Sequence, residues 1–337
     1  MMSSRQTFLV PKFRPHQTKF QLSILMAAKD DDDDDDARAQ RFADNESNKS
    51  IDALFIVAQH DGCKWADECR HAKDLCRATR VETGLWSAMS RVHYGPKNRT
   101  LLMYEARYGR LDRVRWLLAR GAPPDARDVD GGTALFLASM HGHADIIHAL
   151  SADADIDIMD NKGYTPLIFA SLLGHTKTVR ALIVAKAGID IADSNGWTPL
   201  HYASGMGYID IVHALIAADA GVDMTADSGS TPLHIASQHG HTDTVRALLT
   251  AHASVNIMDN DGNTPLLIAS QQGHVDIVRA LIAARANVNI SDYRGRTPLD
   301  AAIHFNHESN SNALIDAGAT TGVEADNWSD WEDGGVV

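Results

Sequence analysis

The sequence predicts an all-α solenoid, in which antiparallel helix pairs stack on one another and short β-hairpin loops project from the side of the stack. This prediction rests on three observations. Nearly identical segments recur every 33 residues, apolar residues within them have the spacing of buried helix faces, and glycines stand where such helices must end and turn.

The repeat is most evident in two segments, ADSGSTPLHIASQHGHTDTVRALL at residues 226–249 and DNDGNTPLLIASQQGHVDIVRALI at residues 259–282. One threonine in each unit sets the register. These threonines lie 33 residues apart, with a single interval of 32, and are Thr100, Thr133, Thr165, Thr198, Thr231, Thr264 and Thr297. The sequence therefore contains seven units in phase.

The first predicted helix of each unit begins at this threonine. Threonine caps a helix N-terminus, and in five of the seven units proline follows, at the first helical position, where its missing N–H is not needed. Leucine two residues after the threonine and alanine five residues after it fall on one buried face, and the small alanine allows a neighbouring helix to approach closely. These core positions are Leu135, Leu167, Leu200, Leu233, Leu266 and Leu299, with Ala138, Ala170, Ala203, Ala236 and Ala269.

The second predicted helix follows a glycine that stands nine residues after the threonine in most units and suits the left-handed conformation that ends a helix. Its apolar residues recur three apart, as in Val179 and Leu182, which indicates one buried face. A further glycine stands two residues before each threonine from Thr133 on, usually three residues after an aspartate. This spacing predicts a tight turn in a hairpin loop between successive units.

The segments TPLHYASGMG, TPLHIASQHG and TPLLIASQQG, with DxxG before them and GHxDIVxxLI after them, resemble the ankyrin repeat. A unit of about thirty residues with one apolar face cannot shield itself, so copies must stack to bury a continuous core. The resemblance implies a right-handed solenoid at residues 98–319 that binds other proteins on its concave side. A polar second helix in the last unit, with Ser311 in place of valine, fits a terminal cap.

The remaining segments are predicted from composition. Residues 1–49 contain the run Asp30–Asp36 and are expected to be disordered, like the acidic tail at residues 320–337. Residues 50–97 are expected to form a small helical cap on the first repeat. Two alternatives stay open at the N-terminus, namely organelle targeting by the basic residues 1–25 and a second start at Met26.

Residues 50–95 also have an alternative interpretation. Their three-helix outline distantly resembles an F-box, which implies docking onto a ubiquitin ligase as a substrate adaptor. His60, Cys63, Cys69, His71 and Cys76 lie in the same region and could form a zinc site. The cysteines lack a C-x-x-C pair, however, and two of them fit the apolar stripe of a predicted helix, so a structural role is preferred.

The repeated polar residues favour structural roles over catalysis. Histidines such as His143 and His175 lie on stacked helices about 8–10 Å apart, whereas zinc ligands lie about 2 Å from one ion, so the resemblance makes them internal hydrogen-bonding groups. Aspartates such as Asp160 and Asp193 recur because each turn needs a side chain that bonds its own backbone. We therefore expect no metal site, no cofactor and no enzymatic activity.

The net charge of −13 disfavours nucleic acid and anionic lipid as partners, and three cysteines are typical of a reducing, cytoplasmic setting. We expect a soluble monomer that acts as a protein-binding scaffold or adaptor. Its contact residues are sought at positions that the repeat leaves free to vary, the loop tips and the exposed edge of each first helix. The predicted partner-binding residues are Tyr164, Leu172, Leu173, Trp197, Met206, His239, Tyr293 and Arg294, of which Tyr164, Leu172, Leu173, Trp197 and Met206 are expected to form one exposed cluster.

Overall fold

The structure is a computed structural model that describes residues 93–94 and 97–322. These residues belong to the second of two compact units, Trp86–Val337, and the first unit, Met1–Leu85, lies outside the described range. The predictions for residues 1–49, for nearly all of the helical cap with its F-box-like and zinc alternatives, and for the tail from residue 323 therefore concern residues outside it.

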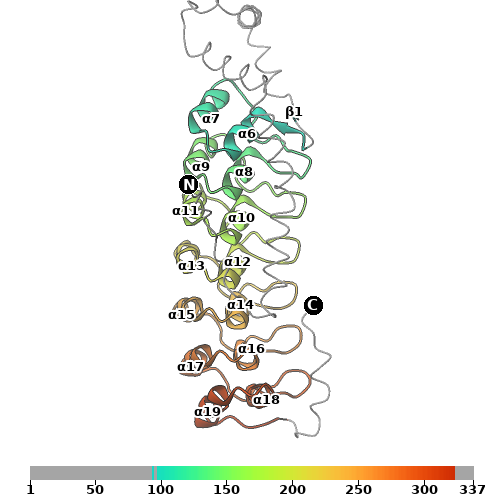
Figure 1. Cartoon of the computed structure of the whole chain (residues 1–337), viewed down its shortest axis with the longest axis vertical. Helices are drawn as coiled ribbons and strands as arrows, with labels where there is room; N and C mark the ends of the chain where they lie inside the picture. Colours follow the sequence, from blue (N-terminus) through green and yellow to red (C-terminus); the bar gives the residue numbers. More distant parts are fainter. Residues whose placement is uncertain (1–92, 95–96, 323–337) are drawn as a thin grey trace, which may run out of the picture. The chain divides into compact units, whose positions relative to one another are not determined.

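The described residues contain fourteen helices, arranged as two columns beside each other (Figure 1). The first helices of the seven repeats are in contact one after another and form one column: α6 Leu101–Arg107, α8 Ala134–Met140, α10 Pro166–Leu172, α12 Pro199–Met206, α14 Pro232–His239, α16 Pro265–Gln272 and α18 Pro298–His304. The second helices form the other column: α7 Leu111–Leu118, α9 Ala144–Leu150, α11 Thr176–Val184, α13 Ile209–Ile216, α15 Thr242–Thr250, α17 Val275–Ala283 and α19 Glu308–Asp316. The predicted solenoid of helix pairs is confirmed.

Two short strands precede the first column. β1 His93–Tyr94 pairs antiparallel with β2 Arg99–Thr100, in register His93 with Thr100. The expectation of a helical cap at residues 50–97 is therefore wrong for His93–Tyr94, because this segment pairs as a strand with the start of the first repeat. Asp128 accepts a hydrogen bond from the Nε–H of Arg99 at 3.0 Å and ties β2 to the next repeat.

The helices begin and end where the repeat pattern places their signals. Thr165 Oγ1, for example, accepts a hydrogen bond from the N–H of Ile168 at 3.2 Å, and Pro166 follows at the first helical position. Gly240 ends α14 with a φ of +77°, in the left-handed region that glycine adopts without strain.

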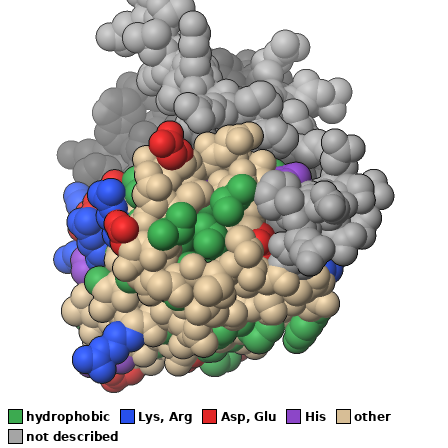
Figure 2. Space-filling view, turned by 90° about the horizontal axis from the view of Figure 1, so that it is seen from below, with side chains coloured by type: hydrophobic (Ala, Val, Ile, Leu, Met, Phe, Trp, Pro, Cys, Tyr) green, Lys and Arg blue, Asp and Glu red, His purple; other side chains and the backbone are tan. Residues whose placement is uncertain are grey.

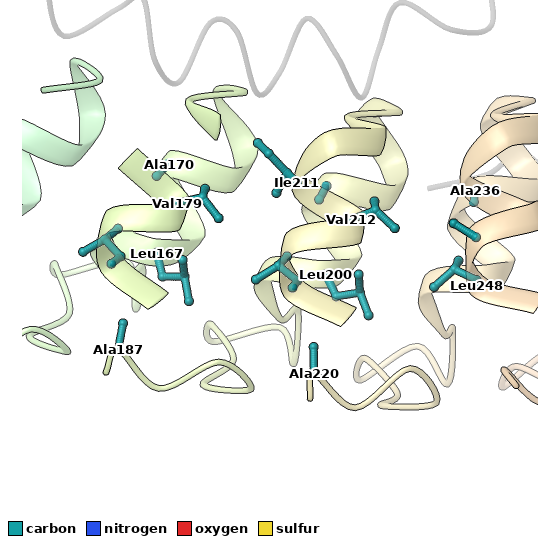
Figure 3. Close-up of a cluster of buried hydrophobic side chains, with 14 of the residues drawn as sticks. Leu167, Ala170, Val179, Ala187, Leu200, Ile211, Val212, Ala220, Ala236 and Leu248 are labelled. Atoms are coloured by element: carbon teal, nitrogen blue, oxygen red, sulfur yellow. The ribbon is translucent and has the colours of Figure 1, made fainter. Parts of the chain in front are cut away.

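The core lies between the two columns and between successive repeats (Figure 3). Leu167 and Leu200 of the first helices, and Val179 and Val212 of the second helices, have no measurable exposure. The alanines five residues after each threonine from Thr133 to Thr264 are also fully buried, so the backbones of neighbouring first helices approach closely. Both predicted apolar stripes are confirmed.

Histidines form polar links across the repeat boundaries. In five repeats the histidine ten residues after the threonine donates from Nε2 to a backbone carbonyl of the preceding repeat, at 2.8–3.3 Å. These bonds join His143 to Arg107, His175 to Met140, His241 to Gly205, His274 to Gln238 and His307 to Gln271. The histidines are hydrogen-bonding groups inside the stack, as the resemblance implied.

A second kind of histidine caps the first helices. His201 accepts at Nδ1 from the Thr198 backbone N–H at 3.2 Å and donates from Nε2 to Ser230 O of the next repeat at 3.1 Å. His234 makes the equivalent bonds to Thr231 and Asn263. Burial lowers the pKa of His201 to about 4 and also lowers that of His234. Both histidine side chains are therefore neutral in the folded protein at neutral pH.

The projecting loops also bond to one another. Each contains two backbone hydrogen bonds, as from Asp193 N–H to Trp197 O at 3.0 Å and from Gly196 N–H to Asp193 O at 3.1 Å, and is a turn rather than a pair of strands. Successive loops are joined in the same way, for example from Asn260 N–H to Ser228 O at 2.9 Å. The expectation of a disordered tail is wrong for its first residues, because Thr320 donates a hydrogen bond to Asn289 and Gly322 donates one to Asp300.

The neutral buried histidines predict a stability that falls with acidity. Since the pKa of His201 is about 4 in the folded chain against 6.5 for a free histidine, the unfolded chain binds more protons between these values. The neutral His201 ring thus contributes at most roughly 3 kcal/mol to the free energy of unfolding. This contribution is fully present above pH 6.5 and is lost as the pH falls toward 4. Thermal melts followed by circular dichroism should show this loss between pH 7 and pH 5. A His201→Asn variant that shows an unchanged dependence on pH would contradict the assignment.

Two glycines allow the close packing between repeats to be measured. Gly121 and Gly240 both have positive φ, but a Cβ on Gly121 meets nothing within 4 Å, whereas a Cβ on Gly240 lies 2.7 Å from the ring of His274. We expect Gly121→Ala to cost about 1 kcal/mol of backbone strain. Gly240→Ala should cost at least twice as much, because the His274 ring must move away from its carbonyl partner. Equal losses in urea unfolding would show that the ring moves at no cost.

Candidate protein-binding surface

The loop before each first helix is fixed by the aspartate at its start. Asp160 Oδ1 accepts a hydrogen bond from the Tyr164 N–H at 2.8 Å, and Asp193 Oδ1 accepts one from the Trp197 N–H at 2.9 Å. These are the Asx turns that the spacing of aspartate and glycine predicted. They hold Tyr164 and Trp197 directly before α10 and α12, at equivalent positions of the third and fourth repeats.

Five aromatic side chains of three successive repeats lie in one row. Phe136 packs edge-on against Phe169 at 5.0 Å between ring centroids. Tyr164 packs against Phe169 at 5.4 Å and against Tyr202 at 6.1 Å, and Trp197 packs against Tyr202 at 5.1 Å between ring centroids. We call these five residues the aromatic row. Such contacts stabilise the pairs by about 0.5–1.5 kcal/mol each beyond burial.

The aromatic row has a buried side and an outward side. Phe136, Phe169 and Tyr202 are buried, whereas Tyr164 and Trp197 are half-buried and form its outer edge. The Tyr202 hydroxyl donates to Asp193 Oδ2 at 2.6 Å, and burial together with this bond raises the pKa of Tyr202. Tyr202 therefore remains a protonated donor that fixes the loop carrying Trp197.

Sequence reasoning found Tyr164 and Trp197 but missed the three buried members of the row. A signal was present, because Phe169 and Tyr202 both stand four residues after their threonines, where Ile235 and Ile268 stand in later repeats. Across the boundary between these repeats, Tyr164 packs against both aromatic residues.

The other predicted residues of these repeats lie at the opposite end of the first helices. Leu173, Met206 and His239 stand eight residues after their threonines and are half-buried. We call these three residues the helix-end row. Nine residues of chain separate it from the loop positions of Tyr164 and Trp197, which corresponds to about 13 Å along a helix. The predicted single cluster is therefore wrong, because its members occupy two separate rows.

Leu172 also departs from its predicted exposure. Its side chain is only 5% exposed, because it ends a helix, α10, that is packed between α8 and α12.

Tyr293 and Arg294 are exposed at the tip of the last loop, with Tyr293 at 73%. They lie three repeats away from Trp197, or roughly 30 Å for helices packed about 10 Å apart, and so belong to a different part of the surface.

Burial also sets the charge state of the helix-end row. His239 lies 6.2 Å from the ring of His241, and burial lowers the pKa of His239 to about 4. At neutral pH the row therefore presents two aliphatic side chains and one neutral ring. Within the described residues, no group of three or more histidine, cysteine, aspartate or glutamate side chains is placed to hold a metal ion.

The first repeat places a carboxylate where later repeats have alanine. Glu105 is buried at this position, and its oxygens accept hydrogen bonds from Arg110 at 3.4 Å and from Arg113 at 3.3 Å, both within the same repeat. The charge of this buried carboxylate is therefore balanced by two arginines of its own repeat, which indicates a structural role.

Among the helices of the described range, none is long and apolar enough to cross a lipid bilayer.

Comparison with protein families agrees with this architecture. A model of three ankyrin repeats matches the sequence in six overlapping stretches between residues 75 and 325, about three quarters of the 337 residues. The first stretch begins at residue 75 and so includes the end of the region predicted as a separate cap. A comparison with curated proteins gives no match. The chain therefore belongs to the ankyrin-repeat family, whose repeats form protein–protein interaction domains.

Proposed function

We propose that this protein is a non-enzymatic scaffold or adaptor that binds a partner protein on the loops and first helices of its third and fourth repeats. The observation that carries this proposal is the pair of half-buried aromatic residues, Tyr164 and Trp197, held in adjacent loops by the buried Tyr202 between them. Each of these two residues keeps part of its surface accessible to solvent.

The fold itself does not require aromatic residues at these positions. The residue immediately before the threonine is glycine, serine, asparagine or arginine in the other repeats, and the loops before Thr133, Thr231, Thr264 and Thr297 close in the same way. A large aromatic side chain in two neighbouring repeats is therefore an addition to the framework. Aromatic residues in partly enclosed settings are the type that dominates the binding energy of protein interfaces.

The aromatic row is also prepared for binding before a partner arrives. The Asx turns fix the backbone of both loops, and the contacts with Tyr202 restrict the rings of Tyr164 and Trp197. Ordering a flexible side chain at an interface costs about 0.5–1.5 kcal/mol, and this cost is reduced where the side chain is already held.

The helix-end row supplies a second contact on the same repeats. Leu173 and Met206 belong to the third and fourth repeats, as do Tyr164 and Trp197. Two apolar areas about 13 Å apart fit a partner that lies across the first helices and touches both of their ends. Lys162, which is exposed in the loop of Tyr164, adds a positive charge at the margin of this surface.

Removing the central aromatic ring tests the proposal. We expect Trp197→Ala to reduce partner capture by at least tenfold, since a central aromatic anchor contributes about 2 kcal/mol or more. Captured proteins are crosslinked in cell extract and quantified by mass spectrometry. Because the ring also contacts Tyr202, this variant should lose about 1 kcal/mol of stability, so helicity is verified at the assay temperature. Val184→Ala is the matched control, because Val184 is 69% exposed in the second column. Equal capture by wild type and Trp197→Ala would refute the proposed surface.

The helix-end row is tested separately. We expect Met206→Ala to weaken capture of the same partner by a smaller factor, about threefold to tenfold, because this side chain lies at the margin of the contact. The same crosslinking assay measures the loss, with Gln272→Ala, at the equivalent position of the sixth repeat, as control. If only the Met206 variant loses the partner, the binding surface lies at the helix ends and not on the loops.

A further inference from the structure

The last repeat ends the stack with apolar side chains that no described residue covers. Six residues after the threonine, the second to sixth repeats have serines, Ser139, Ser171, Ser204, Ser237 and Ser270, all fully buried at the contact between first helices. The last repeat has Ile303 at this position, and its side chain is 38% exposed. Isoleucine has thus replaced serine at the one repeat that has no described neighbour beyond it.

The second helix shows the same change. Eighteen residues after the threonine, Ile183, Ile216, Leu249 and Ile282 pack against the core, whereas Ile315 of the last repeat is 56% exposed. Figure 2 views the stack from this end and shows hydrophobic side chains gathered in the middle of it. We call Ile303 and Ile315 the end face.

The chain itself continues along this end. Thr320 N–H donates to Asn289 Oδ1 at 2.8 Å, which repeats the bond from Asn287 to Asn256 one unit earlier. Gly322 N–H then donates to Asp300 Oδ2 at 2.8 Å. Asp300 stands at the position where His201 and His234 bond to the following repeat. The last described residues therefore follow the path that leads into a next repeat.

Asp300 also has an incomplete set of partners. Its side chain is fully buried, and its second oxygen, Oδ1, accepts no hydrogen bond from any described residue. A buried carboxylate oxygen without a donor is destabilising by more than about 1 kcal/mol. Because Gly322 is bonded to the other oxygen, the residues that follow it in the chain are candidates to supply an N–H donor.

We propose that residues 323–337 fold back over the end face and cover Ile303 and Ile315 with Trp328 and Trp331. The length of chain permits this. Trp328 is six residues beyond Gly322, a reach of up to about 20 Å, whereas Ile303 lies one helical turn, about 5 Å, beyond Asp300. The segment carries two of the six tryptophans of the sequence.

The composition of this segment fits the position. A terminal repeat requires an apolar inner side and a polar outer surface, because nothing stacks beyond it. Around the two tryptophans stand Asp326, Asp330, Glu332 and Asp333. With the indole rings turned onto the isoleucines, these carboxylates face solvent and give the stack a charged end.

A second copy of the chain is a poorer occupant. A stable interface between two proteins uses about 20–30 residues on each side, and the end face has two large aliphatic side chains. A segment joined to the same chain needs far less contact, because its effective concentration is in the millimolar range.

The test follows the two tryptophans in the full chain. The protein is labelled with 5-fluorotryptophan, and the fluorine resonances of Trp328 and Trp331 are assigned with single Trp→Phe variants. A synthetic peptide of residues 320–337 gives their positions in a free segment. We expect both resonances in the full chain to differ from those of the peptide, and Ile303→Ser with Ile315→Ser to move them to the peptide values. Ile303→Ser places at this position the residue that five other repeats have there, so the fold tolerates it.

The control and the opposing outcomes are defined by the same spectra. Val184→Ser removes an exposed aliphatic side chain far from the end face and should leave both resonances in place. Resonances of the full chain that coincide with those of the peptide would overturn the proposal, as would an equal shift in the Val184 variant. A mass by light scattering that doubles with concentration, and returns to the monomer value in Ile303→Ser, would assign the end face to a second copy instead.

Discussion

Every feature of this structure depends on the inability of a single repeat to bury its own apolar face. A helix pair of about thirty residues exposes leucine and alanine on one side and valine and leucine on the other, and only another pair of the same shape can cover both. The full burial of Leu167, Leu200 and Leu233 shows that each repeat covers its neighbours. Because this contact is apolar and carries little directional information, polar bonds between repeats set its register.

Those polar bonds explain why certain side chains recur. The histidines that donate to the preceding repeat, the capping histidines that bond to the following one, and the loop-to-loop backbone bonds all connect equivalent positions one unit apart. Each position committed to such a bond is unavailable for recognition. The positions that remain available for recognition lie directly before the threonine and at the end of each first helix. The outer residues of the aromatic row and the helix-end row occupy these positions. Trp197 and Tyr164 also pack on Tyr202, so the same rings stabilise the loops that carry them.

Most of the fold was predictable because its signals are local and repeated seven times. The caps at the threonines, the left-handed glycines and the apolar stripes all follow from spacing, and the structure confirms them. The surface was less predictable, because exposure depends on neighbours that spacing alone does not describe. Leu172 was expected to be exposed but is packed between two helices, and Met206 was expected beside Trp197 but lies at the far end of α12. The strand His93–Tyr94 was missed because two paired residues leave no periodic pattern.

The last repeat shows how the stack can stop without losing its register. Asn310, buried at the position where Ile277 packs in the previous repeat, donates to the carbonyls of Ala269 and Ser270 at 3.4 Å and 3.3 Å, so a polar side chain now faces backward into the stack. Asp300 caps its own helix by accepting from the Thr297 N–H at 2.9 Å, in place of the histidine that elsewhere reaches forward. The change at Asn310 thus pairs a polar group with residues already present, whereas Asp300 still takes a donor, the Gly322 N–H, from the segment that follows the repeat. Ile303 is the exception, because it exposes a large apolar side chain where the second to sixth repeats have a small, buried serine. This gain of apolar area at the end of the stack is the feature that the proposed packing of residues 323–337 would account for.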